Sequence, residues 1–343
     1  MRPLLLPPNV IDHFYRGGER LAALRGVALP SPFRPEEWLA ATVHRAGEPG
    51  VGSSSAPDGT PFAGVVAADP VGWTGVAQPP AGLSDTGLLV KLLDAGQRLP
   101  VHVHPTRPFA RDHLHSCYGK TEAWYVLETA GEDAAVWVGF GEDVDPRELA
   151  ARVEAQDAEW MLARMNELRV RPGDGVVVPA GQVHATGAGV FLVEAQEPTD
   201  FSILLEWSAT TASKDEAHLG LGLDVALPAV DHRALEDVGA LHTHVDLDAR
   251  GADPVRVLAP AADPYFRLDL VAPGSGARTV TVGHGFAVAI VLGGGEFGWS
   301  GGEQEIARGQ VYVIPDGIGD WTVGGGGSVV VCRPARSWPE LRD

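Results

Sequence analysis

Four side chains between residues 102 and 184 have types and positions that could bind one divalent metal ion. His102 and His104 form a His-x-His pair, Glu122 begins the apolar run AWYVL, and His184 follows a Pro-x-Gly turn. Side chains two residues apart in a strand project from the same face, so the paired histidines can reach one ion. Three imidazoles and a carboxylate suit Zn, Mn, Fe, Co or Ni, and the donor types do not select among these metals. The sequence therefore predicts one divalent metal ion per chain, bound by His102, His104, Glu122 and His184.

The spacing around these residues is more informative than a His-x-His pair, which also occurs on surfaces and in cores without any metal. The first segment reads Gly-x5-His-x-His from Gly96. The last reads Gly-x5-Pro-x-Gly-x2-His from Gly173. Together, the two segments favour a metal site.

Apolar runs around these segments predict the strands that would position the ligands. GLLVKLLDAG is continuously apolar around Lys91, as expected of a buried strand, and GVFLVEAQ, which contains Glu194, is also strand-like. Helical character is indicated for residues 145–168, which begin with an Asp-Pro pair, and for residues 212–240. We therefore expect residues 1–248 to form a metal-binding β domain with a helical insertion and a later helical segment.

The pattern changes at about residue 249, where short strand-like runs alternate with glycine-rich turns. This pattern is typical of a small antiparallel sandwich or barrel. GQVYVIPDG, from Gly309, repeats the Gly-x5-Pro-x-Gly spacing of the first half, but Asp320 stands where His184 would. Residues 249–343 are therefore expected to form a second barrel that lacks the metal ligands.

Charge and composition limit the partners of the chain. The 343 residues carry a formal net charge of -19, which argues against nucleic acid or an anionic membrane as a partner. No stretch is long and apolar enough to span a bilayer. Cys117 and Cys332 are the two cysteines, so there is no disulfide framework, and we expect a cytoplasmic protein. The sequence does not indicate an oligomeric state.

The motifs resemble those of the cupin superfamily and, within it, the type I mannose-6-phosphate isomerase family. LLVKLLDAGQRLPVHVHP, GKTEAWYVL and RPGDGVVVPAGQVHATGAGVFLVEAQEPTD carry this resemblance, which covers residues 87–206 most closely. It implies a mainly β fold of two cupin (double-stranded β-helix, or jelly-roll) barrels with a helical insertion. The implied activity is the interconversion of mannose 6-phosphate and fructose 6-phosphate through a cis-enediol, and the implied metal is zinc.

The resemblance also assigns roles to individual residues. The later three ligands of the family match His104, Glu122 and His184, whereas its first ligand is normally glutamine and is His102 here. A glutamate in the strand after the last ligand matches Glu194, the candidate general base, and two family lysines match Lys91 and Lys120. The implied catalytic residues are thus Glu194 and Lys120. Lys91, Lys120 and His115, which lies in a polar loop, are predicted to contact the sugar or sugar phosphate.

Two positions depart from the family pattern at the phosphate side. Pro100 replaces a serine before the first ligand and offers neither a hydroxyl nor a backbone N–H. Leu204 replaces an arginine ten residues beyond the glutamate, and so removes a guanidinium of the kind that recognises phosphate. The sequence therefore leaves open which sugar is the substrate and whether it is phosphorylated.

Other functions also fit the pattern. A cupin site with three histidines and one glutamate suits a metalloenzyme of other chemistry, such as a dioxygenase or an epimerase. Because Leu204 replaces the family arginine, the protein could also be a sugar-binding regulator without catalytic activity. Such a regulator would bind a sugar in D2O without any deuterium entering the sugar. A further His-x-His pair, His242 and His244, is expected to lie in a linker between the barrels.

Overall fold

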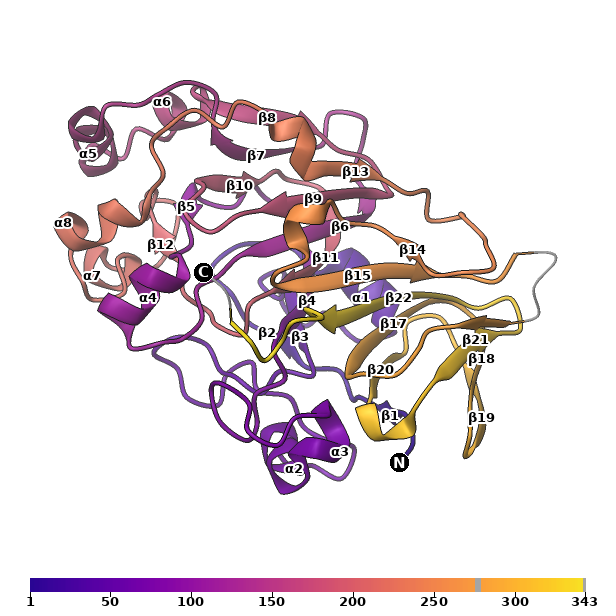
Figure 1. The fold of residues 1–343 in the computed structure, drawn as a ribbon. Coiled ribbons are helices and arrows are strands. Elements are labelled where there is room, and N and C mark those ends of the chain that lie inside the picture. Colours follow the sequence, from indigo (N-terminus) through magenta and orange to yellow (C-terminus); the bar gives the residue numbers. More distant parts are fainter. Residues whose placement is uncertain (275–278, 342–343) are drawn as a thin grey trace.

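The computed structural model describes residues 1–274 and 279–341, and their strands form four sheets of antiparallel strands (Figure 1). Two sheets come from the first part of the chain and contain the predicted metal ligands. The other two consist of the last strands together with the N-terminal strand β1 (Leu4–Leu5). The prediction of a mainly β chain with two barrels is confirmed, whereas the predicted domain boundary after residue 248 stays a prediction.

The first barrel consists of a large and a small sheet. The large sheet has the strand order β13-β9-β6-β11-β4-β3-β2, and the small sheet has the order β12-β5-β10-β7-β8. In these orders, the strands of the large sheet span His242–His244, Asp174–Val178, Glu122–Thr129, Val190–Gln196, Leu89–Asp94, Glu36–Leu39 and Val10–Ile11. Those of the small sheet span Ile203–Leu204, His102–Val103, His184–Thr186, Ala135–Phe140 and Met165–Arg169.

The second barrel is built in the same way. Its larger sheet has the order β1-β20-β17-β22-β15-β14, and its smaller sheet has the order β16-β21-β18-β19. After β1, the strands of the larger sheet span Val311–Ile314, Ala287–Gly293, Ser328–Pro334, Phe266–Val271 and Val255–Arg256. Those of the smaller sheet span Thr279–Thr281, Trp321–Gly324, Gly295–Trp299 and Gly302–Ile306. The strand predicted from RTVTVG includes Arg278, which lies outside the described residues.

Alternation along the central strands sends charged side chains into the first barrel. Successive side chains of a strand point to opposite faces. In β4, Lys91 lines a cavity inside the barrel, whereas Val90 and Leu92 belong to a hydrophobic core cluster. The same cluster contains Val288 and Val330 of the second barrel. The large sheet therefore has one face toward the cavity and the other toward the second barrel.

The helices are short and lie outside the sheets (Figure 1). The α-helices α1 to α8 span Glu19–Arg25, Phe62–Ala68, Pro70–Thr74, Arg107–Leu114, Pro146–Glu154, Ala158–Leu162, Lys214–Ala217 and Leu223–Ala226. The 3-10 helices η1 to η4 span Leu227–Ala229, Val238–Leu241, Pro260–Ala262 and Asp316–Ile318. The longest of these described helices has nine residues, and none of them is long and apolar enough to cross a membrane.

Two segments differ from the structure expected of them. The stretch predicted to be helical up to residue 168 forms α5 and α6, but its end is strand β8, which pairs with β7. His242 and His244 do not lie in a linker, because they form β13, which pairs with β9 at the edge of the large sheet (Figure 1). In both cases hydrogen bonds to a distant strand determine the local conformation.

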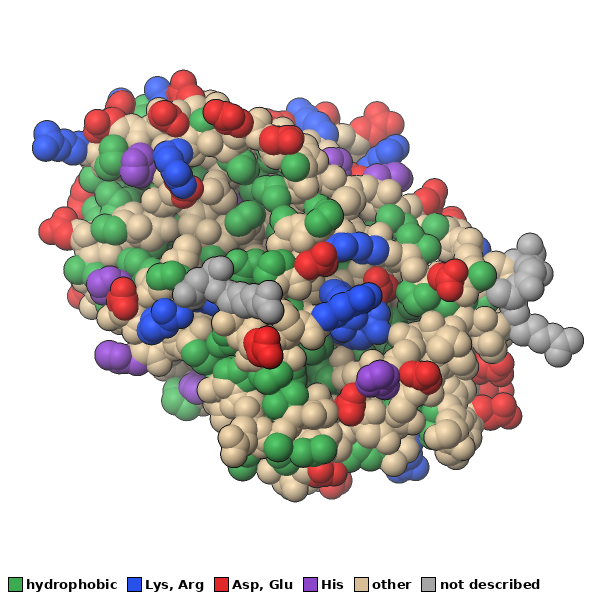
Figure 2. Space-filling view, in the orientation of Figure 1, with side chains coloured by type: hydrophobic (Ala, Val, Ile, Leu, Met, Phe, Trp, Pro, Cys, Tyr) green, Lys and Arg blue, Asp and Glu red, His purple; other side chains and the backbone are tan. Residues whose placement is uncertain are grey.

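The acidic side chains are distributed over the surface. On the face shown in Figure 2, acidic and basic side chains are interspersed. The formal net charge of -19 is therefore spread over many positions rather than gathered in one patch of this face.

Candidate functional site

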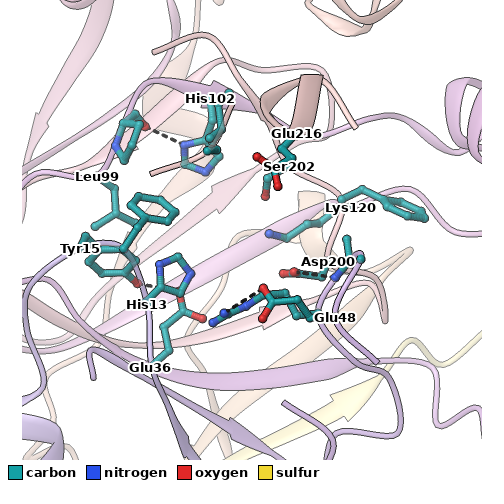
Figure 3. Close-up of a pocket in the computed structure, with 18 of the residues that line it drawn as sticks. His13, Tyr15, Glu36, Glu48, Leu99, His102, Lys120, Asp200, Ser202 and Glu216 are labelled. Atoms are coloured by element: carbon teal, nitrogen blue, oxygen red, sulfur yellow. Dashed lines mark hydrogen bonds and ion pairs between the residues drawn. The ribbon is translucent and has the colours of Figure 1, made fainter. Parts of the chain in front are cut away.

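A cavity of about 1040 Å³ opens inside the first barrel and contains most of the predicted site residues. Its walls come from β3, β4, β6, β11 and β12, from the N-terminal segment 12–15, from the loop 45–48, and from residues 211–220 around α7. Figure 3 shows side chains from these elements directed at a common space, with His102 on one side and His13 and Glu36 on the opposite side. Segments far apart in the sequence thus meet at one site.

Three imidazoles form a compact group at this cavity. His102, His104 and His184 each offer one ring nitrogen, and these nitrogens all lie within 4.8 Å of one another. His102 and His184 face each other directly in the pairing of β5 with β10, and His104 follows β5. The turn before His184 contains Gly181, whose φ of 91° favours glycine and whose N–H donates to the carbonyl of His104 at 2.8 Å.

Backbone carbonyls orient all three rings in the same way. The Nδ1 atoms of His102, His104 and His184 lie 2.8, 2.8 and 2.9 Å from the carbonyl oxygens of Pro100, Phe201 and Gln182. Because a carbonyl can only accept, each Nδ1 carries the proton and donates it, which leaves the lone pair on Nε2. The Nε2 atoms of His104 and His184 are buried and have no hydrogen-bond partner among the described residues. Lone pairs that are buried and unpartnered in this way fit a metal site.

Glu122 completes the group from β6. Its carboxylate oxygens lie 2.9 Å from Nε2 of His104 and 3.5 Å from Nε2 of His184. Two donor atoms bound to one tetrahedral metal, each at about 2 Å, are separated by about 3.3 Å, so these distances fit a shared ion. Trp124 donates to the carboxylate at 3.1 Å, and Nζ of Lys120 lies 3.4 Å from it. The residues present therefore fit a divalent metal ion.

The protonation states also suit metal binding. Burial lowers the pKa of His102, His104 and His184 below the usual value, so the rings are neutral. Burial alone would raise the pKa of Glu122, but its close contacts with His104 and with the cation Lys120 outweigh burial and hold the pKa well below the usual value. Neutral imidazoles and an ionised carboxylate are the forms that coordinate a metal.

A second group of charges surrounds Lys91 on the wall opposite the imidazoles. Its Nζ lies 3.3 Å from Glu194, 3.7 Å from Glu36 and 3.8 Å from Asp200. Lys91 and Glu194 face each other in the pairing of β4 with β11. Burial lowers the pKa of Lys91, but the three carboxylates outweigh it and raise the pKa above its usual value. Lys91 is therefore a fixed buried cation.

Glu194 combines burial with an unusual pKa. Burial raises the pKa of its carboxyl group to about 7, and the opposing effect of Lys91 does not cancel this. Glu194 also faces Trp124 of β6 across the pairing of β11 with β6, two residues from Glu122. A carboxyl group that changes its charge near neutral pH, next to a candidate metal, has the properties of a general acid or base.

Several cavity residues carry no signal in the sequence. Tyr15 donates to Glu36 at 2.6 Å, and Trp38 donates to Glu36 at 2.9 Å. His13 lies 3.4 Å from Glu36, and burial lowers the pKa of His13 to about 4. In the loop 45–48, Arg45 lies 3.3 Å from Glu48. The contacts of Tyr15 and His13 with Glu36 join separate segments of the chain, and only the folded chain reveals them.

Carboxylates outnumber cations in the lining. Among the described residues that line the cavity, the cations are Arg45, Lys91 and Lys120. The carboxylates are the buried Glu36, Glu122 and Glu194, the half-buried Asp200, and the exposed Asp12, Glu48, Asp215 and Glu216. Apart from a bound metal, the cavity is therefore an acidic environment.

The predicted contact residues divide into two groups. Lys91, Lys120 and Glu194 line the cavity, and Lys120 extends into its interior (Figure 3). His115 ends α4, is exposed, and does not belong to the lining. Pro100 and Leu204 line the cavity beside the imidazoles: the carbonyl of Pro100 accepts from His102, and Leu204 faces His102 in the pairing of β12 with β5.

Comparisons with known proteins agree with this arrangement. No family model matches the chain. The chain is 27% identical to the Bacillus subtilis protein named probable mannose-6-phosphate isomerase GmuF, over 97% of this chain and 99% of that protein. It is 34% identical to mannose-6-phosphate isomerase ManA of Bacillus subtilis, over 44% of this chain and 50% of that protein.

Solved structures agree with the fold. The structure of the mannose 6-phosphate isomerase from Bacillus subtilis matches with a TM-score of 0.71 at 20% identity, over 97% of this chain and 100% of that one. A mutant of phosphomannose isomerase from Salmonella typhimurium matches with a TM-score of 0.72 at 15% identity, over 98% and 100%. The chain is therefore similar in sequence to mannose-6-phosphate isomerases over nearly its whole length, and it shares the fold of their solved structures.

Proposed function

We propose that the chain is a metal-dependent aldose–ketose isomerase. The observation that carries this proposal is the presence of two complementary groups in one cavity. One is the cluster of three imidazoles with Glu122, and the other is Glu194, whose pKa of about 7 suits proton transfer. The names of the similar proteins support isomerisation of a sugar with the mannose configuration to the corresponding fructose.

Isomerisation requires a proton to move between two adjacent carbon atoms. In its ionised form Glu194 removes the proton from C2 of the aldose, which gives a cis-enediolate, and then returns a proton to C1. A second proton moves from O2 to O1, which completes the ketose. Lys91, held 3.3 Å from Glu194, fixes the position of that carboxylate. Lys120 reaches into the cavity and can donate to a sugar oxygen on which negative charge develops.

His102, His104, Glu122 and His184 would hold the metal ion. A bound divalent ion polarises sugar oxygens and stabilises the negative charge of the enediolate. Zinc is the metal that we expect from the family resemblance, although the donor set also accommodates Mn, Fe, Co or Ni. Elemental analysis of the protein as purified identifies the metal.

Proton NMR in D2O tests the proposed activity directly. The metal-loaded protein is given mannose and mannose 6-phosphate in separate samples, and we expect one of them to form the ketose with deuterium entering at C1. Glu194→Gln should lower turnover about 100-fold to 10000-fold while metal content is kept. Glu128→Gln, which changes an exposed carboxylate of β6, is the matched control. Tight sugar binding without any deuterium exchange would instead indicate a regulator.

A further inference from the structure

The cations of the cavity bear on the kind of sugar that it accepts. Phosphate recognition in proteins relies on guanidinium or ammonium groups and on clustered N–H donors. Each cation of the described lining already has a carboxylate partner. Arg45 lies 3.3 Å from Glu48, and Lys120 lies 3.4 Å from Glu122. Lys91 lies within 3.8 Å of three carboxylates. A phosphate dianion would have to compete with these partners.

The wall beside the imidazoles offers no donor to a phosphate at two decisive positions. Leu204 is directly opposite His102 in the strand pairing, so its apolar side chain occupies the space next to the candidate metal. Pro100 has no N–H, and its carbonyl is already used to orient His102. An anionic group placed against Leu204 and Pro100 would meet apolar side chains rather than hydrogen-bond donors, and the donors nearby are the neutral hydroxyl groups of Ser202 and Thr186.

The opposite wall suits hydroxyl groups. Asp200 lies there with Glu36, and a carboxylate accepts hydrogen bonds from sugar hydroxyls. The rings of Phe14, Tyr15 and Phe33 also belong to this lining and can pack against the C–H faces of a sugar. Acidic acceptors together with aromatic rings recognise a neutral polyol, whereas they repel a dianion.

The balance of charges leads to the same result. Eight carboxylates face three cations in the described lining, and a single divalent metal does not offset this excess. The four exposed carboxylates stand at the mouth, where they would repel an approaching anion. We infer that the substrate of this site is an unphosphorylated sugar, an inference that rests on the proposed isomerase function. The reaction itself moves one proton from C2 to C1 and one from O2 to O1, so it needs no phosphate.

Turnover and binding of D-mannose and D-mannose 6-phosphate test this inference on the metal-loaded full chain. We expect kcat/KM to be at least about 10-fold higher for mannose than for its phosphate, with saturation-transfer NMR showing the same preference in binding. A preference for the phosphate in both measurements would overturn the inference and leave the isomerase function intact. If neither sugar is isomerised, the proposed function fails, and the binding preference still decides between neutral and phosphorylated ligands. Failure of both sugars to bind would overturn the inference as well.

A charge introduced at Leu204 supplies a second test. Leu204→Arg places a guanidinium beside His102 and should raise kcat/KM for mannose 6-phosphate relative to mannose about 10-fold or more. Leu204→Met is the matched control, because it keeps an apolar side chain of similar volume and should leave that ratio near the parent value. An unchanged ratio in the arginine variant, with metal content retained, would show that this wall does not set the preference.

Discussion

Individual side chains of the metal site are held in place before any ion arrives. A carbonyl accepts from each Nδ1, so the three Nε2 lone pairs are aimed at one point. Partners of this kind fix the tautomer and the ring orientation of metal-binding histidines. The backbone carbonyls of Pro100, Phe201 and Gln182 therefore fix the orientation of the three rings.

Removal of one imidazole should remove the metal. For His104→Ala we expect divalent-metal affinity to fall at least about 100-fold, because a direct ligand is lost. Even the loss of a group that is hydrogen-bonded to a ligand costs about 10-fold to 100-fold. Turnover should fall with metal content. His113→Ala, on the exposed face of α4, is the control of the same residue type and should change neither quantity. A His104→Ala protein that kept its metal in elemental analysis would contradict the assignment.

The pKa of Glu194 predicts the pH dependence of the reaction. A base must be ionised to accept a proton, and burial has raised the pKa of Glu194 to about 7. We therefore expect kcat/KM to be low at acidic pH and to rise as pH increases through a value at or somewhat below 7, since a nearby divalent ion would favour the ionised form. Initial rates between pH 5 and 9 measure this. Rates that fell over the same interval would exclude Glu194 as the base.

The sequence reveals the metal site better than the rest of the cavity. The grouping of the three histidines follows from two spaced segments, in which strand geometry and a tight turn act locally. Tyr15 and Glu36 could not be predicted, since their partners are distant in the sequence. The same holds for the contact of Arg45 with the backbone carbonyl of Asp12. His115 has a plausible type and spacing, yet it is itself the left-handed residue that ends α4, and it is exposed.

Among the strands, the central ones can be identified from apolar runs in the sequence. The edge strands form because of their hydrogen bonds to a neighbouring strand. The strands around Lys91 and Glu194 are continuously buried, so their composition alone indicates them. Strands β8 and β13 contain charged or histidine residues and form because β7 and β9 offer unpaired edges. Composition carries little information about such edge strands.

The N-terminal strand links the start of the chain to the second barrel. In β1, Leu4 pairs with Val313 of β20. Leu6, the residue after the end of β1, is buried and donates its N–H to the carbonyl of Val311. Leu6→Ala should lower the free energy of unfolding by about 2–5 kcal/mol, the usual range for a buried leucine. Leu5→Ala, with Leu5 39% exposed, should change it by less than about 0.5 kcal/mol. Equal losses in urea unfolding would mean that Leu6 is not packed as described.

At the scale of the whole molecule, the two barrels share one hydrophobic core. Val126 and Leu192 of the first barrel lie in the same cluster as Leu268 and Val330 of the second. Separation of the barrels would expose this apolar surface to water, at about 25 cal/mol per Å². The shared core therefore favours unfolding of both barrels in one step.

This coupling predicts that a ligand of the first barrel protects the second. A metal at 100 times its dissociation constant stabilises the folded state by about 2.7 kcal/mol, which slows exchange through global unfolding about 100-fold. Hydrogen exchange should therefore slow in β22, at the core of the second barrel, as much as in β6, which carries Glu122. The His104→Ala protein should show neither effect. Slower exchange confined to the strands of the first barrel would mean that the barrels unfold independently despite their common core.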